Sequence, residues 1–135
     1  MISLDTNVVV DLLGQKRPKV RERFAEAQAV GRRLLLSSVA LFELRFGAAN
    51  SARPQENARA LEALLADGID IVPFDSDDAA EAGAIRALLR RVGQEIGPYG
   101  ILIAAQSRRR GVTLVTHNVT EFERVPGLLV VDWAV

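Results

Sequence analysis

Two short apolar runs of the chain, residues 1–4 and 112–115, are each followed directly by polar side chains. Mg²⁺ and Mn²⁺ prefer oxygen ligands, and such ions can activate water for phosphodiester cleavage. If both runs are strands of one parallel sheet, their carboxyl ends lie at the same edge, where open α/β sheets bind ligands. The side chains expected to meet there are Asp5, Thr6, Asn7, Thr116, His117 and Asn118.

Glu43 and Glu121 are further acidic candidates for this cluster. Glu43 lies in a mostly apolar stretch, residues 41–46, where a carboxylate facing the core would cost several kcal/mol unless it were paired or metal-bound. A simpler interpretation stays open for each carboxylate: Asp5 caps a helix, Glu43 points to solvent, and Glu121 lies on a solvated segment. His117, the only histidine, is a structural or surface residue in one interpretation and a catalyst in another.

These residues can meet only if strands and helices alternate along the chain, and the sequence predicts that order. Short apolar strands separated by helices are typical of a parallel sheet covered on both faces. Ser37 or Ser38 is expected to cap the third helix, and Ser76 or Asp77 to open the fifth. The predicted strands are 1–4, 34–36, 69–74, 112–115 and 128–131; the predicted helices are 8–13, a stretch that follows the charged run 16–23 and ends near 30, 39–50, 54–66, 76–93, 98–111 and 120–123.

Length and composition narrow the class of protein. The 135 residues fit one domain, 1–135, and 49% are hydrophobic, enough for a sizeable core. Seventeen basic residues balance seventeen acidic ones, so any binding of nucleic acid must come from local patches. The basic runs 16–23 and 108–110 are candidates for phosphate contact, although 108–110 also complements a helix dipole.

Several classes are excluded by what the sequence lacks. There is no cysteine, and the glycine patterns of dinucleotide and P-loop binding are absent. The start does not read as a signal peptide, and no apolar run reaches the roughly 18 residues of a membrane span. We therefore expect a cytoplasmic protein with no membrane contact.

Three segments together resemble the PIN-domain ribonucleases, and specifically the VapC toxins of bacterial toxin–antitoxin pairs. LDTNVVVDLL resembles the family's opening, SSVALFELRFGA its second acidic helix, and IGPYGILIAAQSRRRGVTLVTHNVTEFERVPGLLVVDW the stretch with its third and fourth acidic positions. The segments are residues 4–13, 37–48 and 96–133. Their order and spacing, over essentially the whole chain, make the resemblance specific.

The resemblance implies a PIN-like α/β fold, with a five-stranded parallel sheet flanked by helices. It also implies an endoribonuclease dependent on Mg²⁺ or Mn²⁺, in which Asp5, Glu43 and Glu121 hold the metal. Thr6, Asn7 and Thr116 would orient ligands or water, and Asn118 occupies a position that is sometimes acidic in the family. The implied partners are RNA, a VapB-type antitoxin whose C-terminal segment blocks the site, and a second copy in a homodimer or hetero-oligomer.

The chain departs from the family pattern at Gly100. The family reads GPYD or GPLD where this chain reads GPYG, so the third carboxylate is missing. A glycine at this position is also unusual for a helix. The first turn of a helix favours acidic residues, and glycine costs roughly 1 kcal/mol of helix stability relative to alanine. The sequence therefore predicts a ribonuclease whose activity is reduced or abolished.

Three explanations for Gly100 stay open: an engineered or selected inactive variant, a naturally degenerate member, or replacement of the missing oxygen by Gln94 or Glu95. Three functions are also distinguished. The chain is an impaired nuclease, a PIN-fold module that only binds antitoxin or RNA, or an unrelated receiver-like signalling domain. A receiver-like domain requires an acidic cluster at the first strand, an Asp after the third strand and a Lys after the fifth. Only the acidic cluster has a partial counterpart in this chain.

Overall fold

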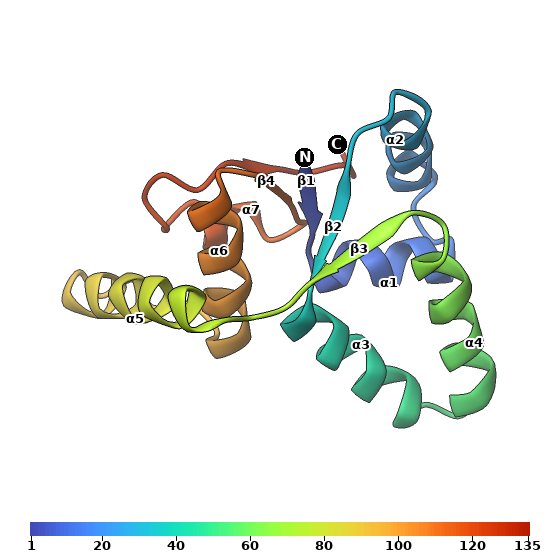
Figure 1. The fold of residues 1–135 in the computed structure, drawn as a ribbon, viewed down its shortest axis with the longest axis horizontal. Helices are drawn as coiled ribbons and strands as arrows, with labels where there is room; N and C mark the ends of the chain where they lie inside the picture. Colours follow the sequence, from blue (N-terminus) through green and yellow to red (C-terminus); the bar gives the residue numbers. More distant parts are fainter.

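Five short strands form one parallel sheet with β1 at its centre (Figure 1). The computed structural model describes residues 1–135, and the strand order is β3-β2-β1-β4-β5. The chain adds β2 and β3 on one side of β1 and then β4 and β5 on the other, so the point of reversal lies between β1 and β4. The strands are β1 (Ile2–Leu4), β2 (Leu34–Ser37), β3 (Ile69–Val72), β4 (Thr113–Val115) and β5 (Val130–Val131).

Seven helices connect and flank these strands. In Figure 1, α3 and α4 form a hairpin on one side of the molecule, and α5 packs against α6 on the other. The predicted fold class is confirmed, although β3 and β5 are shorter than predicted. The helices are α1 (Thr6–Gly14), α2 (Pro18–Ala29), α3 (Ser38–Ala49), α4 (Pro54–Leu65), α5 (Ser76–Arg91), α6 (Pro98–Arg110) and α7 (Val119–Phe122).

Helix starts follow the local chemistry of caps and prolines. A proline occupies the first turn of α2, α4 and α6, where its missing N–H costs nothing. Ser37 caps α3, which confirms one of the two predicted alternatives. α5 begins at Ser76, one of the two predicted alternatives, and Asp75 before it forms a reciprocal capping box with Asp78. The predicted start of α1 was wrong, because Asp5 caps a helix that begins at Thr6, two residues earlier than predicted.

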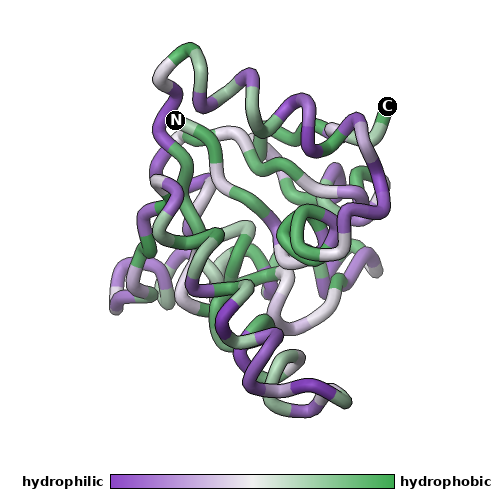
Figure 2. Tube along the Cα trace, turned by 90° about the vertical axis from the view of Figure 1, so that its right-hand side faces the viewer, coloured by the Kyte–Doolittle hydropathy of each residue, from purple (hydrophilic) through white to green (hydrophobic).

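The core lies on and around the sheet. All residues of β1 and β2 are buried, and Ile2, Leu4, Leu36 and Leu114 are at most 1% exposed. Figure 2 shows hydrophobic stretches running through the middle of the molecule, with hydrophilic ones mostly on the outside. None of the helices is long and apolar enough to cross a membrane.

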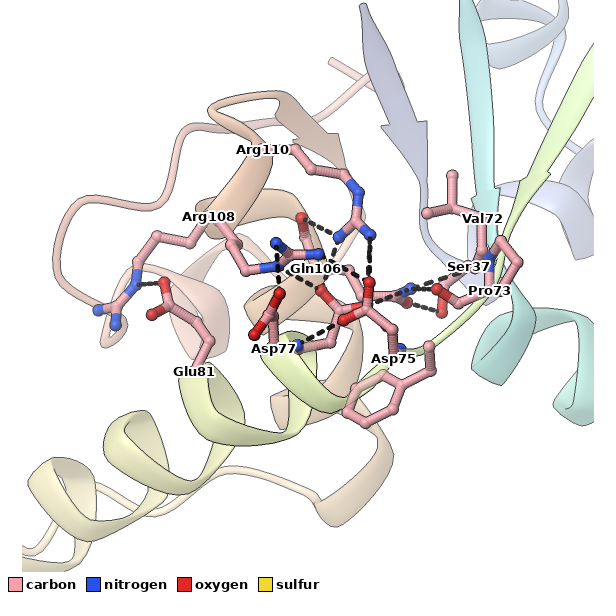
Figure 3. A network of polar contacts seen from close by, with 12 residues as sticks. Ser37, Val72, Pro73, Asp75, Asp77, Glu81, Gln106, Arg108 and Arg110 are labelled. Atoms are coloured by element: carbon pink, nitrogen blue, oxygen red, sulfur yellow. Dashed lines mark hydrogen bonds and ion pairs between the residues drawn. The ribbon is translucent and has the colours of Figure 1, made fainter.

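A charged network joins α5 to α6 (Figure 3). The Asp78 carboxylate is fully buried and accepts hydrogen bonds from Arg109 Nε at 2.8 Å and Arg110 Nη1 at 2.7 Å. Burial by itself would raise the pKa of Asp78, but Arg110, the Asp75 backbone N–H and Arg109 hold that pKa far below its usual value. Arg108 pairs with Glu81 at 2.8 Å. The basic run 108–110 is therefore bound within the molecule, which argues against a free phosphate-binding patch.

Gln106 extends this network to the sheet. Its amide nitrogen donates to the Val72 and Pro73 carbonyls at 3.1 and 3.2 Å, at the end of β3. Its amide oxygen accepts from the Ser37 hydroxyl, which also caps α3. The buried amide thus fixes α6 relative to the start of α3, the helix that carries Glu43.

Candidate active site

A pocket of about 160 Å³ opens at the carboxyl edge of the sheet, between the ends of β1 and β4. This is the point where the strand order reverses, and open α/β sheets bind ligands at such points. Of the side chains that the sequence placed at this site, Thr116 and His117 are missing from the lining. The lining residues are Asp5, Thr6, Asn7, Glu43, Gly100, Ile103, Asn118, Glu121 and Phe122.

Asp5 is held rigidly at the end of β1. One carboxylate oxygen accepts from the Thr6 backbone N–H at 2.9 Å, and the other accepts from the Thr116 hydroxyl at 2.8 Å. Burial raises the pKa of Asp5, the two hydrogen bonds oppose that rise, and the nearby charge of Glu121 adds to it. Asp5 therefore both caps α1 and lines the pocket, so the two interpretations of this residue are compatible.

Thr116 lies beneath the pocket and is fully buried. Besides donating to Asp5, its hydroxyl oxygen accepts from the Asn118 backbone N–H at 3.0 Å. One side chain thus shapes the turn after β4 and orients a carboxylate after β1, the kind of role that the family resemblance implied for it.

Glu43 and Glu121 approach the pocket from two helices. Glu43 is half-buried and accepts from the Thr6 hydroxyl at 2.8 Å, so it faces neither the core nor open solvent. Glu121 accepts from the Gly97 backbone N–H at 3.0 Å, at the N-terminus of α6, where the helix dipole favours negative charge. Both carboxylates are thus held by donors and keep oxygens near the pocket.

Gly100 is the third residue of α6 and lines the same pocket. A Cβ added there would lie 3.4 and 3.6 Å from two ring carbons of Phe122 and 4.0 Å from Ile96 Cδ1, which is ordinary van der Waals contact. Its φ is not positive, unlike that of five other glycines. Neither space nor backbone conformation requires a glycine at this position.

The pocket suits a hard divalent cation in the kind of donors it offers. Asp5, Glu43 and Glu121 present carboxylate oxygens, which Mg²⁺ and Mn²⁺ prefer. No three acidic or histidine side chains are grouped closely enough to hold a metal ion. The position that would add a further carboxylate oxygen is Gly100.

His117 does not line the pocket. Its ring is largely buried between Asp11 and Asp132, so the structure favours the structural interpretation over catalysis. Sequence reasoning missed both carboxylates. No local spacing could have revealed them, because Asp11 and Asp132 are 106 and 15 residues from His117 along the chain.

We expect Thr116→Val to destabilise the protein by about 1–3 kcal/mol, because it removes a buried donor and leaves Asp5 with one fewer hydrogen bond. Urea denaturation at neutral pH measures the change in free energy of unfolding. Thr113→Val, in the strand that Thr116 directly follows, is the matched control, since no side-chain hydrogen bond is formed by Thr113. Equal losses from the two variants would contradict a specific role of Thr116.

The fold and the pocket define a parallel α/β protein with acidic residues where the strand order reverses. The sequence profile described as PIN domain matches residues 2–128, and the chain belongs to the PIN domain family. Within that family it is similar to VapC proteins. It is 40% identical over 131 residues to the tRNA(fMet)-specific endonuclease VapC of Shigella flexneri, covering 97% of this chain and 96% of the relative. A Salmonella typhimurium protein of the same name is 37% identical over 130 residues, covering 96% of each.

Solved structures agree with the sequence comparison. DNA-bound VapBC from Salmonella typhimurium matches with a TM-score of 0.89 and 36% identity, covering 98% of this chain and 97% of that chain. VapBC2 from Rickettsia felis, bound to a DNA fragment from its promoter, matches with a TM-score of 0.91 and 29% identity, covering 98% and 99%. The predicted resemblance to VapC proteins is confirmed.

Proposed function

We propose that this chain is an endoribonuclease, the toxin of a VapBC-type toxin–antitoxin pair, with activity impaired by Gly100. The observation that carries the proposal is the convergence of Asp5, Glu43 and Glu121 on one pocket of a PIN domain. The near full-length identity to proteins named as tRNA endonucleases supports it. The whole chain would act as one PIN domain, in the cytoplasm, where the RNA substrate is found.

The reaction is hydrolysis: a water oxygen bonds to phosphorus, the bond to the leaving oxygen breaks, and that oxygen takes a proton. Asp5, Glu43 and Glu121 would hold Mg²⁺ or Mn²⁺, which when bound supplies an activated water and offsets the negative charge of the phosphate. Thr116 fixes the Asp5 carboxylate, and Thr6 fixes that of Glu43. Asn7 and Asn118 add amide groups at the rim that can orient water or a phosphate oxygen.

The proposed substrate class is transfer RNA, with initiator tRNA as the first candidate, because relatives with 40% and 37% identity are named for it. The test is to incubate the chain and its Gly100→Asp variant with initiator tRNA, an elongator tRNA and an unstructured RNA, with Mg²⁺ or Mn²⁺. Asp5→Asn in the Gly100→Asp background is the control. Cleavage that persists in this control would count against the site.

A second candidate function is a PIN-fold module that binds antitoxin or RNA without cutting. The specific observation in its favour is Gly100, together with the absence of three closely grouped acidic or histidine side chains. Tight binding by both proteins, with no cleavage of any RNA by either, would favour this module over the nuclease.

The proposed protein partner is a VapB-type antitoxin, in a homodimeric or hetero-oligomeric complex, since three related solved structures with 29–36% identity are VapBC assemblies. An arginine of its C-terminal segment could enter the acidic pocket and form charge-assisted hydrogen bonds with the carboxylates. Gly100 removes one of those negative charges.

We therefore expect Gly100→Asp to tighten binding of an arginine-bearing VapB C-terminal peptide by about tenfold, the effect of one charge-assisted hydrogen bond. Isothermal titration calorimetry measures the affinity. Gly100→Asn separates added bulk from added charge, and a peptide with alanine in place of arginine should lose the gain. An unchanged affinity for the arginine peptide would contradict the proposed mode of binding.

A further inference from the structure

His117 is bound by a carboxylate at each ring nitrogen. Nε2 lies 2.6 Å from Asp11 Oδ2, on α1, and Nδ1 lies 3.0 Å from Asp132 Oδ1, just after β5. The three side chains are only 12–19% exposed. One ring therefore joins a helix, the turn after β4 and the C-terminal segment.

Each ring nitrogen thus faces a carboxylate oxygen. An ionised carboxylate accepts hydrogen bonds only, and an imidazole ring carries at least one N–H, so the ring donates to at least one of its two neighbours. Arg17 adds a guanidinium, with Nε 3.3 Å from Asp11 Oδ2. Burial opposes ionisation of Asp132, but the Ala134 backbone N–H and His117 hold the pKa of Asp132 below its usual value. Two carboxylates and two basic side chains thus meet in one cluster.

This cluster of Arg17, Asp11, His117 and Asp132 lies directly behind the pocket. His117 follows Thr116, which donates to Asp5, and precedes Asn118, which lines the pocket. Asp11 is on α1, the helix whose first N–H, that of Thr6, donates to the other Asp5 oxygen. Both groups that hold Asp5 are therefore on elements that His117 joins together.

We propose that His117 is a positioning residue of the site: through its contacts with Asp11 and Asp132, it fixes the turn after β4 against α1. It thereby sets where Thr116 holds Asp5. The inference rests on the proposed nuclease function for its catalytic consequence, but its geometric part is independent of RNA cleavage. A role in stability alone would leave the turnover of the folded protein unchanged.

The first test is nitrogen NMR of the imidazole, which is unambiguous because the chain has one histidine. We expect Asp11→Asn and Asp132→Asn each to change the shift of the ring nitrogen that the carboxylate faces. Nitrogen shifts that stay unchanged in both variants would overturn the proposal. This result is independent of any activity.

The second test is kinetic, in the Gly100→Asp background. We expect His117→Gln and Asp132→Asn to lower kcat by about 10-fold or more with KM changed less than about twofold, as for residues that orient metal ligands. The double variant should lose little more than either single one, because both changes break the same contact. Asp70→Asn, which breaks the exposed Arg33–Asp70 pair on β3, is the matched control.

Equal kcat values for His117→Gln and Asp70→Asn, in proteins that are folded at the assay temperature, would reduce His117 to a structural role. If Gly100→Asp cuts no RNA, the proposed function fails separately and Mn²⁺ affinity replaces kcat as the readout. We then expect His117→Gln to weaken Mn²⁺ binding about 10-fold, and an unchanged affinity would overturn the positioning role.

Discussion

Replacing Gly100 with aspartate is expected to raise the rate of RNA cleavage by about 100-fold or more. The pocket already holds three carboxylates, and geometry lost at one position of a catalytic site can cost that factor. The added side chain has room, since its Cβ would meet only Phe122 and Ile96 at ordinary contact distances. It would also stand in the first turn of α6, where the helix dipole favours an acid.

The measurement is single-turnover cleavage of tRNA with Mn²⁺, comparing the chain with Gly100→Asp, Gly100→Asn and Gly100→Ala. Asparagine matches the shape of aspartate without its charge, and alanine removes the helix cost of glycine alone. We expect only the aspartate variant to gain activity. Equal rates for aspartate and alanine would mean that the missing carboxylate is not what limits the chain.

The same variant should bind Mn²⁺ more tightly. Four carboxylates repel one another until a cation joins them, so Gly100→Asp should gain more thermal stability from Mn²⁺ than the unchanged chain does. Melting curves with and without Mn²⁺ measure this difference. Equal shifts in both proteins would contradict a metal site completed at position 100.

The structure narrows the explanations for Gly100. Gln94 and Glu95, the nearby residues that could have replaced the missing oxygen, precede α6, and neither lines the pocket. The pocket lining therefore gives no support to the explanation that Gln94 or Glu95 replaces the missing oxygen. An inactivated variant and a degenerate natural member both fit the geometry. In both cases the rate of the Gly100→Asp variant measures how much activity the missing carboxylate costs.

Local patterns explain what could be predicted from the sequence. The five apolar runs became the five strands, and the polar residues after β1 and β4 met at one edge because parallel strands point the same way. The capping box of α5 was missed because Asp75 lies just before the residues predicted to open the helix. Caps are decided by backbone geometry over a few residues, where sequence patterns are least informative.

Long-range polar contacts could not be predicted in the same way. Asp78 meets its arginines 31 and 32 residues away, and Gln106 meets Ser37 69 residues away. Such pairs depend on how helices pack, and a run of arginines carries no sign of which acid each will find. For the same reason His117 was open to several interpretations until its two carboxylates were visible.

Replacing Asp78 with asparagine is expected to lower the free energy of unfolding by about 2–3 kcal/mol at pH 7, and Tm by roughly 8–10 °C. Losing one partner of a buried ion pair commonly costs about 3–5 kcal/mol. The loss here should be smaller because Arg109 and Arg110 are 32% and 24% exposed and can turn toward water. Chemical denaturation measures the change. Asp77→Asn, one residue earlier on the same helix, is the control, because Asp77 is 81% exposed and lies 3.9 Å from Arg109.

The difference in folding stability between the unchanged protein and its Asp78→Asn variant should shrink as the pH falls. The folded-state pKa of Asp78 is depressed, so its carboxylate stabilises the protein fully above the unfolded-state value of about 4. This contribution is lost as pH falls below about 4 toward the depressed folded-state pKa, because the unfolded chain takes up the proton first. The two proteins should therefore converge in stability under acid. A gap that stays constant from pH 7 to pH 3 would show that Asp78 acts through packing and capping, with no contribution from its charge.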